Sequence, residues 1–149
     1  MYATLQEREK YDFSMRLDIN WSDIISLNLP KEASFESLMK QGRMFYLIKI
    51  LKGKWKEKGL IEQETKLEVH HPLEFPEPAR IFVRVSDVNS MGFTLDCMIL
   101  SLINNVETVL STASTKMLLY DYKSSKIAAL NEEFLELLHH FNERPLATV

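Results

Sequence analysis

The chain has 149 residues and a formal net charge of -3, with 46% hydrophobic and 26% charged residues. This composition is typical of a soluble globular protein, and the length predicts one domain over residues 1–149 with a sizeable core. The negative net charge argues against a nucleic-acid partner. No apolar run approaches the length of a membrane span, which argues against a membrane-spanning segment. The single cysteine excludes an internal disulfide, so we expect a cytoplasmic protein.

The first half of the chain predicts a strand, a polar loop and one long helix. The strand covers residues 10–19, the loop covers residues 23–30, and the helix ends near Leu51. A stripe at three- and four-residue steps predicts the buried side of this helix. The stripe consists of Phe35, Leu38, Met39, Gly42, Phe45, Tyr46 and Lys49. A glycine inside it predicts that another backbone passes close to the helix at Gly42.

The second half of the chain predicts four strands in succession and a short helix. The strands cover residues 61–69, 80–88, 93–102 and 106–120, and the helix covers residues 131–141. In the first of these strands, alternation places Glu62 and Glu64 on the solvent face. The connection Ile103-Asn104-Asn105 predicts a hairpin between the last two strands. Strands in succession predict an antiparallel meander wrapped around the long helix, an α+β fold.

The segment before the helix and the helix itself carry a spaced motif. Trp21-Ser22-Asp23 is followed by Phe35 and by Gly42-Arg43. Without a gap, this spacing resembles the first motif of hotdog-fold thioesterases of the 4-hydroxybenzoyl-CoA type, W/Y-x-D-x-D-x-x-G-H-V-N-N-x-x-Y followed by A-R. Residues 64–72 and 115–131 are similar to later strands of that family. The resemblance implies a hotdog fold, an antiparallel sheet wrapped around one long central helix with a short C-terminal helix.

The resemblance also implies an activity and an assembly. Members of this family hydrolyse acyl thioesters of coenzyme A or of acyl carrier protein, and they need no cofactor. Hotdog domains join their sheets edge to edge, so we expect a homodimer or homotetramer. The acyl site of such a dimer lies at the interface between the two subunits.

The chain departs from the family where the usual catalytic acid stands. The gap-free alignment places Ile25 on the second Asp of the motif, and Ile25 cannot act as a nucleophile or as a base. Asn28-Leu29 replaces the Gly-His pair, and Lys31-Glu32 replaces the Asn-Asn pair. A branch that releases polyketides from enediyne synthases also lacks the acid, and its helix carries a Gln-Gly-Arg. This chain has Gln41-Gly42-Arg43 at the same offset, so losing the acid need not mean losing activity.

The resemblance implies a substrate site at the start of the long helix. In the family the thioester carbonyl lies against the helix N-terminus, which here means the amides near Lys31, Glu32 and Ala33, with Phe35 on the motif's tyrosine. Unpaired N–H groups at a helix end stabilise a developing oxyanion. The Glu32 carboxylate either activates water or only interacts favourably with the helix dipole.

Two further residues have a functional and a structural interpretation. Arg43 either stabilises charge on the substrate, as the motif implies, or pairs with a carboxylate such as Glu36. Asp23 is either a base or a turn residue before the helix.

We expect no metal site, because His70 and His71 are strand neighbours that point to opposite faces. Cys97 alternates with an apolar set and is predicted to be a core thiol.

Two functions from different classes remain open. The first is a thioesterase acting on acyl-CoA or acyl-carrier-protein, with catalytic roles for Glu32, Arg43 or Asp23. The second is a catalytically silent hotdog protein that binds an acyl chain, coenzyme A or a carrier protein. Ile25 favours the second function, whereas Gln41-Gly42-Arg43 favours the first.

Overall fold

The computed structural model describes residues 8–17, 31–52, 58–71 and 79–143. The predicted loop at 23–30 lies outside these residues, as does most of the proline-containing connection at 71–78. The elements in chain order are β1 (Phe13–Leu17), α3 (Lys31–Leu51), β2 (Lys58–Val69), β3 (Ala79–Asn89), β4 (Gly92–Ile103), β5 (Val106–Asp121), β6 (Lys126–Ala128) and α4 (Glu132–Glu143).

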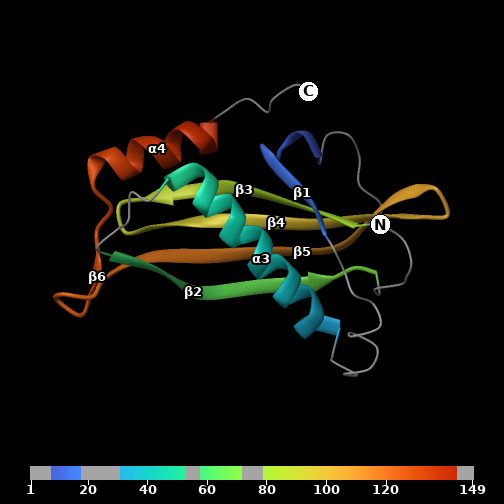
Figure 1. Cartoon of the computed structure of the whole chain (residues 1–149), viewed down its shortest axis with the longest axis horizontal. Coiled ribbons are helices and arrows are strands. Elements are labelled where there is room, and N and C mark those ends of the chain that lie inside the picture. Colours follow the sequence, from blue (N-terminus) through green and yellow to red (C-terminus); the bar gives the residue numbers. More distant parts are fainter. Residues whose placement is uncertain (1–7, 18–30, 53–57, 72–78, 144–149) are drawn as a thin grey trace.

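The strands form one antiparallel sheet in the order β1-β3-β4-β5-β2, with β6 paired to β5 (Figure 1). The predicted meander of four consecutive strands is wrong at its first step, because β2 pairs with β5 and not with β3. The sequence between β2 and β3 has several prolines and no tight-turn pattern, which disfavours a hairpin between these two strands. Among the described strands, β2 and β1 therefore stand at the two edges of the five-strand path.

Side chains of the sheet alternate between two faces. On β3, Ile81, Val83 and Val85 are buried on the face that α3 crosses, which we call the inner face. Phe82 points to the opposite, outer face, where it packs with Met98, Leu100 and Val109 in a smaller cluster.

Helix α3 spans 21 residues and lies diagonally across the inner face (Figure 1). Its buried side consists of Phe35, Met39, Arg43, Tyr46, Leu47, Ile50 and Leu51. These positions follow the 3.6-residue period. The predicted stripe is wrong at Phe45, which is 54% exposed, and at Lys49, which is also exposed. Both residues lie on the side of the helix that faces away from the sheet.

Gly42 marks a close approach between α3 and the sheet. A Cβ atom at this position would clash with the buried side chain of Ile81 on β3. The predicted close contact therefore exists, but the group that approaches is a side chain and not a second backbone. The absent side chain lets α3 pack directly onto the inner face at Ile81.

The hairpin and the last helix agree with their predictions. Asn104 and Asn105 connect β4 and β5 with positive φ angles of 52° and 65°, the conformation that a two-residue type I′ turn needs. Asn131 caps α4 by accepting a hydrogen bond from the Phe134 amide at 2.8 Å. The short strand β6 was not predicted. Among the described residues, no helix combines the length and hydropathy needed to cross a membrane.

Candidate functional site

Arg43 lies in the middle of the helix–sheet interface. It stands on the buried side of α3, and only 2% of its side chain is exposed. Its Nη2 atom is 2.8 Å from Oε1 of Glu36, two helical turns earlier, and 2.5 Å from Oε2 of Glu62 on β2. A guanidinium stays charged even when buried, so it needs opposite charge within reach. The predicted alternative of pairing with Glu36 is confirmed, and a second carboxylate joins that pair.

A β-bulge brings Glu62 to this cluster. The register of β2 with β5 shifts between Glu62 and Glu64, where Glu62 pairs with Met117 and Glu64 pairs with Lys116. Because paired residues share a face, Glu62 points to the inner face together with the buried Met117. The predicted exposure of Glu62 is confirmed, but its carboxylate lies on the inner face, beside Arg43. Simple alternation along residues 61–69 gave no signal for the extra residue, and the bulge reverses the side on which Glu62 stands.

The remaining donors of Arg43 face the interior. Its Nε and Nη1 atoms are buried and have no hydrogen-bond partner in the described part of the chain. Burial by itself would lower the pKa of Arg43, but the acidic groups of Cys97, Glu36 and Glu62 raise it above its ordinary value. The site therefore holds a permanent buried cation whose hydrogen-bonding capacity is only partly used.

Cys97, on β4 of the sheet, lies next to Arg43 of α3. Burial raises the pKa of its thiol to about 12, although the nearby Arg43 guanidinium acts in the opposite direction. At neutral pH the sulfur is protonated, and a protonated buried thiol is a poor nucleophile. The prediction that Cys97 is a core thiol is confirmed by its burial.

The exposed side of the cluster is formed by its carboxylates. The side chains of Glu36 and Glu62 are 38% and 27% exposed, and Lys40 lies 3.7 Å from Glu62 at the rim. A ligand reaching Arg43 therefore meets these carboxylates first. Because β2 is an edge strand, this side of the site also lies at the edge of the sheet.

The matching family model is decisive for the classification. The model of the thioesterase-like superfamily matches residues 20–138, which is most of the chain and includes α3 and the Arg43 cluster. The chain belongs to the thioesterase-like superfamily. By sequence, no curated protein matches it.

Solved structures share the fold of this thioesterase-like chain. A thioesterase from Thermus thermophilus, complexed with coenzyme A and Zn, is 16% identical, with a TM-score of 0.72 over 92% of this chain and 99% of that chain. A probable thioesterase from Escherichia coli is 14% identical, with a TM-score of 0.72 over 87% of this chain and 98% of that chain. A 1,4-dihydroxy-2-naphthoyl-CoA thioesterase from Synechocystis is 12% identical, with a TM-score of 0.69 over 88% and 98% of the two chains. At these identities the likeness concerns the fold, an antiparallel sheet with helices that is consistent with the hotdog fold.

The other predicted site residues are placed unevenly. Lys31, Glu32 and Ala33 belong to the first turn of α3, whose amides lack helical acceptors. Phe35 follows one turn later and is fully buried in the core. Asp23, like Ile25, lies outside the described residues. The catalytic role of the start of α3 stays a prediction.

The length of α3 separates its first turn from Arg43. Arg43 is twelve residues beyond Lys31, which corresponds to about 18 Å along an α-helix. The first-turn amides and Arg43 of one α3 therefore cannot bind the same carbonyl group.

His70 is engaged elsewhere, since its Nε2 lies 2.9 Å from the Thr112 hydroxyl. In the described part of the chain, no group of three His, Cys, Asp or Glu side chains could hold a metal ion.

Proposed function

We propose that this chain is an acyl thioesterase that hydrolyses thioesters of coenzyme A or of acyl carrier protein. Residues 1–149 would form a single hotdog domain, with the sheet wrapped around α3 as its central helix, in a cytoplasmic protein of the 4-hydroxybenzoyl-CoA thioesterase type. The observation that carries the proposal is the buried Arg43 guanidinium with two uncommitted donors, in a member of the thioesterase-like superfamily. The Gln41-Gly42-Arg43 sequence, shared with the enediyne branch, supports the same function.

The chemistry starts at the N-terminus of α3. Its free amides near Lys31, Glu32 and Ala33 polarise the thioester carbonyl, with Phe35 behind them. The Glu32 carboxylate takes a proton from water, with Asp23 in the preceding loop as the other candidate base. The resulting hydroxide attacks the carbonyl carbon, and the tetrahedral intermediate expels the thiolate. The C–S bond breaks, the thiolate takes up the proton, and a carboxylic acid is released.

Arg43 contributes positive charge to a site built from two subunits. The Glu62 partner of Arg43 stands on β2, the edge strand through which two hotdog sheets would join. In a homodimer formed there, Arg43 of one subunit lies toward the interface, so it can serve the α3 N-terminus of the other. This arrangement removes the conflict of the roughly 18 Å separation within one helix. A homotetramer would contain two such dimers.

A second function is favoured by the ion pairs themselves. Arg43 is held by both Glu36 and Glu62, as expected of an arginine whose role is structural. With Ile25 in place of the usual acid, the protein would then bind an acyl chain, coenzyme A or a carrier protein without cleaving it.

A hydrolysis panel distinguishes the two functions. The purified protein is assayed with short-chain, long-chain and aromatic acyl-CoAs, and release of free thiol is followed. We expect turnover of at least one class and a loss of at least about tenfold in kcat/KM for Arg43→Ala, which would correspond to one lost charge-assisted interaction. Glu32→Gln should reduce kcat, since it keeps the volume and removes the base.

The controls address folding and charge. Arg43→Lys keeps a cation but loses the planar fork, so an activity between those of the parent and Arg43→Ala is expected. Circular dichroism should show that all variants are folded. Equal hydrolysis by the parent and Arg43→Ala would make Arg43 structural. Absence of turnover, together with saturable binding of acyl-CoA in calorimetry, would establish the silent binding protein.

A further inference from the structure

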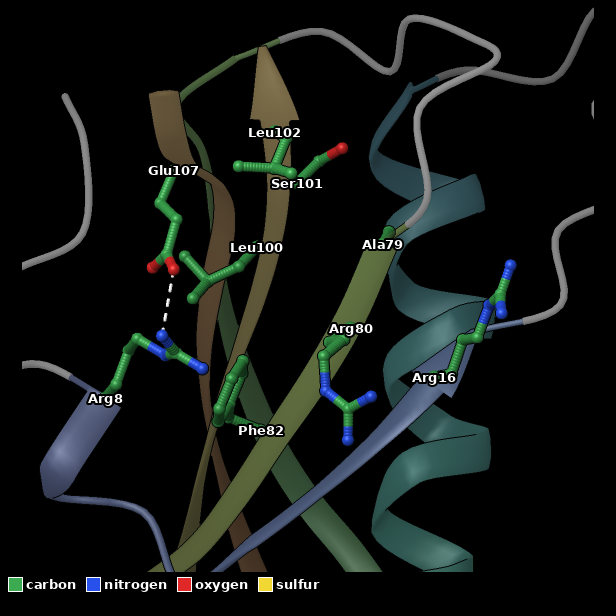
Figure 2. A pocket seen from close by; sticks show the side chains of 9 residues that line it. All are labelled: Arg8, Arg16, Ala79, Arg80, Phe82, Leu100, Ser101, Leu102 and Glu107. Carbon is green, nitrogen blue, oxygen red and sulfur yellow. Dashed lines mark hydrogen bonds and ion pairs between the residues drawn. The ribbon is translucent and has the colours of Figure 1, made fainter. Parts of the chain in front are cut away.

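A pocket opens on the outer face of the sheet, on the side opposite α3. Its volume is about 350 Å³, within the range of small-molecule sites. The residues that line it are Arg8, Arg16, Ala79, Arg80, Phe82, Leu100, Ser101, Leu102 and Glu107. Figure 2 shows the side chains of Phe82 and Leu100 between the Arg8–Glu107 pair and the arginines of β1 and β3. The pocket thus combines an apolar floor with charged walls.

Two arginines of the pocket are directly opposite each other. Arg16 on β1 and Arg80 on β3 are register partners in the antiparallel pair, so both side chains leave the sheet on the same face. Like charges in this arrangement are unfavourable. Arg80 donates a 3.0 Å hydrogen bond to the hydroxyl of Ser14, which carries no charge. Within the described residues, neither arginine has a carboxylate at salt-bridge distance.

The remaining charges of the pocket cancel. Arg8 and Glu107 form a 2.8 Å ion pair, and the Arg8 guanidinium also lies 5.8 Å from the ring centroid of Phe82. The pocket therefore retains the two positive charges of Arg16 and Arg80. A matched anion would remove the repulsion between them and accept hydrogen bonds from both guanidinium groups.

The floor defines the rest of the ligand. Phe82 and Leu100 belong to the buried outer-face cluster, and Leu102 extends the apolar surface as an exposed side chain. Tyr11 packs against the same cluster, with its ring edge-on to Phe82 and the two ring centroids 5.9 Å apart. An ion without an apolar part would leave this surface wet, whereas an alkyl chain would cover it.

We propose that the outer-face pocket binds an amphipathic monocarboxylate, with its carboxylate between Arg16 and Arg80 and its alkyl chain over Phe82, Leu100 and Leu102. The pocket and the Arg43 cluster lie on opposite faces of the sheet. Binding here is therefore independent of thioester hydrolysis, and the proposal does not rest on that activity.

The test uses sodium decanoate as the probe, at concentrations below micelle formation, with calorimetry on the full chain. The parent should bind decanoate, and the Arg16→Gln/Arg80→Gln double variant should lose at least about tenfold in affinity, because two charge-assisted hydrogen bonds are removed. Decan-1-ol, which has the chain without the charge, should bind at least about tenfold more weakly than decanoate. Acetate, which has the charge without the chain, should not bind measurably.

A matched control is available on the same face. Arg84 also stands on β3, but it is paired with Asp96 at 3.2 Å and does not line the pocket, so Arg84→Gln should change decanoate affinity by less than about twofold. Thermal unfolding without ligand verifies that the variants are folded. If the double variant does not fold, the single Arg16→Gln variant replaces it. Arg43→Ala should bind decanoate at this pocket like the parent.

Several results would overturn the proposal. These are equal affinities of the parent and the double variant, equal affinities for decanoate and decan-1-ol, or no decanoate binding by the parent. Binding to phosphatidylglycerol vesicles without binding of monomeric decanoate would instead identify a membrane surface as the partner. A smaller species in sedimentation for the double variant, again without decanoate binding, would identify the pocket as a contact between copies of this chain.

Discussion

The two faces of the sheet treat their arginines in opposite ways. On the inner face, Arg43 is almost fully buried and is held by Glu36 and Glu62. On the outer face, Arg16 and Arg80 are exposed, stand directly opposite each other and have no carboxylate partner in the described part of the chain. Water can solvate the outer pair, whereas the inner guanidinium depends on protein groups. The comparison shows that a guanidinium needs carboxylate partners when it is removed from water, and not merely because it is charged.

The largest expected effect follows from removing the inner carboxylates. The Glu36→Gln/Glu62→Gln double variant leaves a buried cation without a counter-charge, which should lower the free energy of unfolding by about 3–5 kcal/mol. Urea denaturation measures this loss. Adding Arg43→Met should recover at least about half of it, because an apolar side chain of similar length needs no counter-charge.

The same carboxylate-to-amide change elsewhere on β2 is the control. Glu64 lies 3.8 Å from Lys116, and both side chains are at least half exposed. Glu64→Gln should therefore change stability by less than about 0.5 kcal/mol. If the inner double variant costs as little as this control, the carboxylates are not needed to hold Arg43, and the contrast between the two faces disappears.

A smaller effect of opposite sign is expected on the outer face. Arg16→Gln removes one member of a like-charged cross-strand pair, so it should stabilise the ligand-free protein by up to about 0.5 kcal/mol at low salt. The gain should vanish near about 1 M NaCl, where the Debye length is only about 3 Å. Thermal unfolding at the two salt concentrations measures both values. A destabilised Arg16→Gln variant would show that the arginine is held by favourable contacts.

Sequence and structure agree where a signal is local. The family resemblance carried by Asp23, Phe35 and Arg43 singled out Arg43, and the Asn104-Asn105 pair was sufficient to predict the hairpin. Both signals depend on residues that are close in sequence. Local sequence therefore located one half of the inner cluster.

The other half of the cluster depends on pairing between distant segments. Glu62 reaches Arg43 only because a bulge changes the register of β2 against β5, and alternation within β2 carries no trace of that shift. The opposition of Arg16 and Arg80 likewise exists only once β1 pairs with β3. The exposure of Phe45 has a similar origin, since the direction in which α3 faces the sheet is fixed by tertiary packing at Gly42 and Ile81.

The central claim is that each thioester site takes its helix N-terminus from one subunit and Arg43 from the other. Complementation between two variants with reduced activity tests it most directly. Arg43→Ala and Glu32→Gln are co-expressed with different tags, mixed oligomers are isolated by both tags, and acyl-CoA hydrolysis is measured. One site of each mixed dimer would combine an intact Glu32 with an intact Arg43, so the mixture should recover up to about half of the parent's kcat. Mixed oligomers with no more activity than either variant alone would contradict the shared site.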